Sequence, residues 1–250
     1  MRIGTKTTRA VTHLVVLALA LCASLPARAQ RAHEAKLAEA SEVLQAFTAN
    51  EADSIPLDLL QRAHGIAIIP NVIRAGFIVG GRRGRGVLVV RSENGEWSNP
   101  AFITLTGGSI GWQIGAESAD MVLVFANDRS IVNIRSGKFT LGGDASAVAG
   151  PVGRQATMAL TFRAEVYGYL RSRGLYAGAA FQGVRLDVDE DSGARFYAAD
   201  IRAEQLGPQN DGTPASARRF LLALEQTTMN SGPARHQESS AQEAQTFPLD

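Results

Sequence analysis

Apolar residues near the start of the chain recur at helical spacing. Within residues 31–47 they are three or four positions apart, with glutamates and a lysine between them, which predicts an amphipathic helix. The apolar positions are Leu37, Ala40, Leu44 and Phe47. A second helix is predicted over residues 54–65, because a proline suits its first turn and Gly65 is a natural stop.

From Gly65 onward, short apolar runs alternate with Gly, Pro, Asn and Asp, which predicts β-strands. The runs are GIAIIP, AGFIVGG, GVLVVRS, AFITLTG, DMVLVFAND and GLYAGAAFQGVRLDV. Asn94-Gly95 favours a hairpin turn in which both central residues have positive φ. The predicted fold class is α+β, a single domain with a curved, glycine-rich antiparallel β-sheet or barrel flanked by N-terminal helices and a C-terminal helix.

The segment ALTFRAEVYGYL, residues 159–170, alternates strictly between apolar and polar positions. This period predicts a strand with one core face and one polar face. Tyr167 and Tyr169 fall on the predicted polar face, where a tyrosine beside arginines suits a membrane interface or a protein contact. An ordinary exposed sheet face is the alternative.

Three sections of chain are expected. Residues 1–29 have a basic start, a short apolar core and the small-residue pattern Ala27-Arg28-Ala29, which predict a cleavable signal peptide and secretion to the periplasm or envelope. Residues 30–226 form the folded domain, whose last helix is signalled by Thr213-Pro214. Residues 227–250 are polar and aperiodic, which is typical of a disordered tail.

Composition argues against several classes of function. Cys22, the single cysteine, lies inside the predicted signal, so thiol chemistry is not expected of the mature chain. Removing residues 1–29 leaves 21 basic and 24 acidic residues, a net charge of −3, which does not favour nucleic acid as a partner. No histidine or acidic cluster has metal-site spacing, and we expect neither a metal nor a cofactor.

Two motifs are weak candidates for chemistry. Residues 107–111, GGSIG, fit the G-x-S-x-G pattern with Ser109 as nucleophile, but a strand-like segment follows where a hydrolase would have a helix. We therefore expect no enzymatic activity. The segment DVDEDSG, residues 187–193, lacks the glycine and glutamate of a calcium loop and is predicted to be a solvated hairpin tip.

The segment GGRRGRG, residues 80–86, is the strongest candidate binding site. Glycines there allow a tight reversal or bulge between two strands. The surrounding arginines, with no acid among them, could meet an anion together with open backbone N–H groups; a solvated turn is the alternative. These basic residues are Arg74, Arg82, Arg83, Arg85 and Arg91, and a second group near the tyrosines comprises Arg163, Arg171 and Arg173.

Four motifs in series resemble the SYLF-domain family, which includes yeast actin-binding proteins and secreted bacterial relatives. They are AHGIAIIPNVIRAGFIVGGRRGRGVLVVR, GEWSNPAFITLTGGSIGWQIGAESADMVLVF, LGGDASAVAGPVGR and YGYLRSRGLYAGAAFQGVRLDVD, within about residues 52–224. The resemblance implies a non-catalytic domain that binds lipid, with phosphoinositides as ligands and actin as a partner in eukaryotic members.

For an exported chain, the resemblance leads us to expect anionic phospholipid or a membrane surface as the partner. Arg82, Arg83 and Arg85 are the expected contacts, joined by the second arginine group. The rival hypothesis is an envelope structural or interaction module that uses the same basic surface to meet a protein. A hydrolase using Ser109 is the remaining alternative.

Overall fold

The computed structural model describes residues 30–50, 54–135, 139–152, 164–172, 175–177, 183–197, 207–210 and 212–230. Besides the N-terminal helix of residues 30–48, its helices are α2 (Leu57–Gln61), α3 (Asp128–Arg135), α5 (Glu190–Tyr197) and α6 (Ala215–Asn230). The strands are β1 (Gly65–Val90), β2 (Ala101–Phe125), β3 (Phe139–Leu141), β4 (Ala147–Ala149), β5 (Val166–Ser172), β6 (Leu175–Ala177) and β7 (Val184–Val188).

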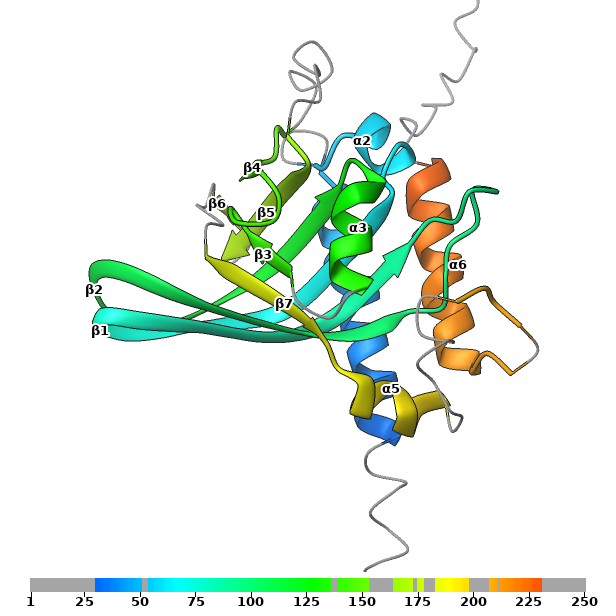
Figure 1. Ribbon diagram of the computed structural model, residues 1–250, viewed down its shortest axis with the longest axis horizontal. Helices are drawn as coiled ribbons and strands as arrows, with labels where there is room; N and C mark the ends of the chain where they lie inside the picture. The colour runs from blue at the N-terminus through cyan, green and yellow to red at the C-terminus, as the bar shows by residue number, and fades with distance from the viewer. Residues whose placement is uncertain are drawn as a thin grey trace, which may run out of the picture.

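Within these residues, seven strands form one sheet that nearly closes into a barrel, with helices packed around it (Figure 1). The order is β3-β7-β2-β5-β4, with β1 also paired to β2 and β6 to β5. The predicted α+β single domain is confirmed. The sheet is mixed rather than purely antiparallel, because β4 and β5 run parallel.

Strands β1 and β2 are far longer than the sequence pattern predicted. The runs expected as separate strands join into strands of 26 and 25 residues, which pair antiparallel from Gly65 and Phe125 to Leu88 and Ala101. A straight strand of that length would span about 85 Å, too long for one domain. Register shifts between Ile69 and Val72 and between Gly76 and Ile78 let the paired strands bend.

The bend brings two parts of β1 against each other. We call residues 65–74 the first arm and residues 80–90 the second arm. At the far end of both arms, the Arg91 N–H donates to the His64 carbonyl at 2.8 Å. A Cβ at Gly84 would lie 2.7 Å from Ile69 Cγ2, and a Cβ at Gly86 only 2.2 Å from the Ile68 oxygen. The glycines of this segment therefore permit a close crossing of the arms.

The predicted reversal at residues 80–86 is wrong. That segment lies inside β1, and the chain reverses instead over residues 91–100. There the Gly95 N–H donates to the Ser92 carbonyl at 2.9 Å, and Gly95 has φ of 88°. Asn94 does not have positive φ, so the turn is a type I turn followed by a left-handed glycine rather than the expected type I′ turn.

Both faces of the central strands are buried, which explains their unbroken apolar runs. Alternate residues of β1, such as Ile66 and Val87, join a helix-side core with the N-terminal helix, α2 and α6. The intervening residues, such as Ala67 and Leu88, join a sheet-interior core, to which α3 contributes Ile131.

Strand β2 holds the two parts of the sheet together. Its residues 103–107 pair with β7, and its residues 120–125 pair with β5. Because β1 accompanies β2 along its whole length, the bent ribbon belongs to both parts of the sheet.

The terminal helices agree well with their sequence patterns. The four apolar residues predicted to face the core from the N-terminal helix are all buried. Helix α6 continues to Asn230, past the boundary expected at residue 226. Among the described residues, no helix has both the length and the apolar character needed to cross a membrane.

The acidic segment at residues 187–193 is not a hairpin tip. Asp189 caps the first turn of α5, since its carboxylate accepts the Ser192 N–H at 2.9 Å and the Ser192 hydroxyl at 2.8 Å. Asp187 is paired with Arg185 at 2.8 Å. Asp189 thus caps helix α5, and Asp187 forms an ion pair with Arg185 on the same strand, β7.

The arm crossing leads to a stability prediction. Gly86→Ala should destabilise the fold by about 3 kcal/mol or more, because the new methyl group meets backbone atoms of Ile68 and Ile69 that cannot turn aside. Urea unfolding of the mature chain measures the loss. Gly108→Ala is the matched control in β2, since nothing lies within 4 Å of its Cβ position. Equal stability of both variants would contradict the crossing.

Candidate functional site

Four of the arginines predicted to bind an anion lie on β1. The bent end of the β1–β2 ribbon projects beyond the rest of the domain (Figure 1), but Arg82, Arg83 and Arg85 lie nearer the body of the sheet, because the β2 residues opposite them also pair with β7. Across the ladder, Arg82, Arg83 and Arg85 are opposite the uncharged residues Gly107, Thr106 and Thr104, in that order. The residues directly paired with these arginines are therefore uncharged. One strand farther, β7 places Arg185 beside Thr106 and Asp187 beside Thr104, and these two residues form an ion pair with each other.

The four arginines do not form one patch, because they divide between the two faces of the ribbon. Successive side chains of a strand point to opposite faces. Arg83 and Arg85 share the face of Val87, which joins the helix-side core farther along, and both arginines are exposed. Arg82 shares the opposite face with Leu88 and is only partly exposed.

Arg74 and Arg82 come together from the two arms. Val72 in the first arm lies against Gly84 in the second, where a Cβ would be 3.0 Å from Val72 Cγ2. Burial lowers the pKa of Arg82, and the nearby positive charge of Arg74 lowers it further. We call Arg74 and Arg82 the inner pair and Arg83 and Arg85 the outer pair. Arg74 of the inner pair is directly opposite Glu117 in the ladder, whereas both residues of the outer pair are directly opposite threonines.

The second arginine group is only partly described. Arg171 donates to the Ala46 carbonyl in the last turn of the N-terminal helix, where a positive charge is favourable. Arg171 thus fastens that helix to β5. Arg163 and Arg173 lie outside the described residues, so the structure does not place them beside the ribbon.

The expectation that Tyr167 and Tyr169 face solvent is wrong. Their relative exposures are 6% and 0%, and both belong to the helix-side core. The Tyr169 hydroxyl donates to the Pro151 carbonyl at 3.1 Å, and its ring leaves no room for a Cβ at Gly150. The alternation was read correctly, but the face taken as polar is covered by other parts of the chain.

Ser109 lacks the backbone setting of a hydrolase nucleophile. Residues 107–111 lie within β2, and Ser109 is paired with Gly80 in the ladder. A nucleophile elbow requires a sharp strand-to-helix turn, which this continuous strand does not make. Among the described residues, no group of three or more His, Cys, Asp or Glu side chains could hold a metal ion.

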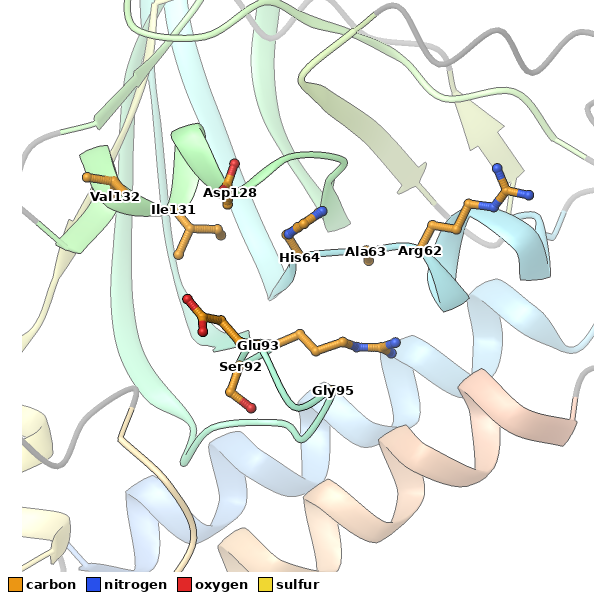
Figure 2. Close-up of a pocket in the computed structure, with 10 residues that line it drawn as sticks. Arg62, Ala63, His64, Ser92, Glu93, Gly95, Asp128, Ile131 and Val132 are labelled. Atoms are coloured by element: carbon orange, nitrogen blue, oxygen red, sulfur yellow. The ribbon is translucent and has the colours of Figure 1, made fainter.

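A cleft of about 600 Å³ lies at the other end of the arms, where His64 and Arg91 meet. It is formed by the end of α2, the turn after β1 and helix α3, and Figure 2 shows His64, Glu93 and Ile131 around its central space. Its charged and polar lining residues are Arg62, His64, Arg91, Ser92, Glu93 and Asp128.

Sequence reasoning missed this cleft. Its residues come from three segments: the end of the predicted second helix, the predicted turn at Asn94-Gly95, and α3, which was not predicted. The one lining residue predicted to bind an anion was Arg91, which was grouped with the ribbon arginines. In the structure, Arg91 instead donates to the Gln61 carbonyl at 2.7 Å and lies over the Trp97 ring at 4.4 Å.

Comparison with known proteins agrees with this architecture. Residues 106–227 match the family model described as "Ysc84: Las17-binding protein actin regulator". Fold and match together define the class as a SYLF-type α+β domain. The chain belongs to the Ysc84/SYLF domain family.

Curated relatives support the assignment. The chain is 35% identical over 198 residues to "SH3 domain-containing YSC84-like protein 1" of Homo sapiens, covering 76% of this chain and 58% of that protein. It is 36% identical to the Mus musculus protein of the same name, with the same coverage. It is 33% identical over 195 residues to "LAS seventeen-binding protein 3" of Saccharomyces cerevisiae, covering 76% of this chain and 42% of the relative. The chain thus spans about half the length of these relatives.

Proposed function

We propose that the protein is a non-catalytic domain that binds anionic phospholipid at a membrane surface of the bacterial cell envelope. The observation that carries the proposal is the outer face of the β1 ribbon, where Arg83 and Arg85 are exposed two residues apart. Uncharged residues are opposite them in the ladder. Both arginine side chains can therefore contact one membrane surface without first breaking an ion pair with the residue directly opposite.

The energetics favour a weak, reversible attachment. Each basic residue near an anionic membrane contributes about 1 kcal/mol, and the effect is screened by salt. The outer pair would therefore contribute about 2 kcal/mol, with the inner pair of Arg74 and Arg82 adding to the local positive potential. The mature chain is slightly acidic overall, so this local clustering, rather than net charge, would orient the domain on the membrane.

Export places the domain beside such a membrane. The sequence pattern of residues 1–29 supports a cleavable signal peptide and a location in the periplasm or on the envelope. N-terminal sequencing of the purified protein should then start at Gln30. A chain that retains residues 1–29 would contradict this part of the proposal.

A protein partner on the same basic face is the second candidate. It is favoured by the family description as a Las17-binding protein and by the printed name of the yeast relative. An acidic protein surface would meet Arg83 and Arg85 by the same charge attraction. The two functions differ in whether lipid alone is sufficient for binding.

The lipid proposal predicts a specific loss in vesicle binding. Arg83→Ala combined with Arg85→Ala should weaken binding of the mature chain to vesicles of phosphatidylcholine and phosphatidylglycerol about 30-fold, the equivalent of about 2 kcal/mol. Vesicle co-sedimentation measures the change, and binding of the unaltered chain should fall steeply as salt is raised.

The matched control removes the same charge elsewhere. Arg218 and Arg219 are adjacent and exposed on α6, so Arg218→Ala with Arg219→Ala should leave vesicle binding nearly unchanged. Equal losses in both double variants would show that only net charge matters. Undiminished binding of the ribbon variant would contradict the proposed contact, and no vesicle binding by the unaltered chain would favour the protein partner.

A further inference from the structure

We propose that the cleft between α2, α3 and the turn after β1 binds a small zwitterion that carries an ammonium group, a carboxylate and an aliphatic side chain, as an amino acid or a short peptide does. The ligand class follows from three kinds of residue that line the cleft together: an arginine, two acidic residues and two aliphatic residues. It differs from the purely anionic surface that would suit the ribbon arginines, so this inference stands apart from the proposed function.

Arg91 supplies the anion-binding side of the cleft. Its guanidinium is held in place by the Gln61 carbonyl and the Trp97 ring, so little side-chain entropy remains to be lost on binding. Its Nε is buried and has no hydrogen-bond partner among the described residues. Because Nε is closed off from the cleft, a ligand carboxylate would be met by the terminal guanidinium N–H groups that the Gln61 carbonyl does not occupy. Burial also lowers the pKa of Arg91, as expected of a charge that lacks full solvation.

The acidic side is built from two separate elements. Glu93 belongs to the turn after β1, and Asp128 begins α3. Both residues are exposed, and neither has an ion pair among those found in the described residues. An ammonium group can donate three hydrogen bonds and would be attracted to two carboxylates at once.

The apolar wall comes from α3. Val132 is 65% exposed at the edge of the cleft, and Ile131 is buried beside Gly65. An aliphatic ligand side chain would cover apolar surface here. The volume of about 600 Å³ lies within the range of small-molecule sites, which leaves room for two or three linked amino acids.

Calorimetric titration of the mature chain with the dipeptide Ala-Leu tests the proposal. The dipeptide should bind, whereas N-acetyl-Ala-Leu, which lacks the ammonium group, and Ala-Leu amide, which lacks the carboxylate, should each bind at least tenfold more weakly. Glu93→Gln with Asp128→Asn should weaken Ala-Leu at least tenfold and leave the weak binding of the N-acetyl form unchanged. Phosphoethanolamine, a zwitterionic lipid head group without a side chain, should bind more weakly than Ala-Leu.

Two controls separate this site from the rest of the molecule. Asp58→Asn with Asp191→Asn removes the same charge from exposed positions outside the cleft, and should leave Ala-Leu binding unchanged. The ribbon variant Arg83→Ala with Arg85→Ala should also bind Ala-Leu normally, so that failure of the membrane proposal would not affect this result. The inference is overturned if Ala-Leu does not bind, if the cleft variant binds it normally, or if phosphoethanolamine binds more tightly.

Discussion

The close crossing of the two arms of β1 is the constraint on which the rest of the fold depends. Strands of 26 and 25 residues can belong to one small domain only if their ribbon turns back, and at Gly86 the arms approach so closely that no Cβ fits. Burying both faces of such a ribbon then requires an interior core and an outer layer of helices. The folded ribbon thus accounts both for the glycines at the crossing and for the long apolar runs of its strands.

The crossing also explains where the charges lie. Glycine at residues 84 and 86 leaves the inner face without a side chain at the crossing itself, while Arg83 and Arg85, which alternate with these glycines, point to the other face. Arg83 and Arg85 therefore share an exposed face, and Arg74 and Arg82 meet on the other face because the arms meet there. The arginines form one basic cluster in the sequence. In the structure they form an exposed pair, Arg83 and Arg85, and a partly buried pair, Arg74 and Arg82.

The sequence predicted the local elements well and their connections poorly. The N-terminal helix and α6 follow from periodicity, since the face that each buries is encoded within a few turns. Residues 80–86 continue as a strand that packs against Ile68 and Ile69. The glycine content of the segment does not reveal these contacts, so a turn was predicted there. Tyr169 was placed on the correct face of its strand, but which face is covered depends on elements far away in the chain.

The candidate sites show the same limit. The charge-rich ribbon could be found from sequence because its arginines are adjacent, whereas the cleft joins α2, α3 and the turn after β1, which only the fold brings together. Membership of the Ysc84/SYLF family is consistent with a binding domain, since the family description refers to binding and regulation and the yeast relative's name refers to binding.

A single fluorophore on the ribbon would test the central claim most directly. The mature chain is expected to lack cysteine, so Gly81→Cys, at an exposed position with only the Gly107 oxygen near its Cβ, can be labelled selectively with an environment-sensitive dye. Anionic vesicles should shift its emission to the blue, while the same dye at Leu222→Cys on the exposed face of α6 should not respond. A response at α6 with none on the ribbon would contradict the account.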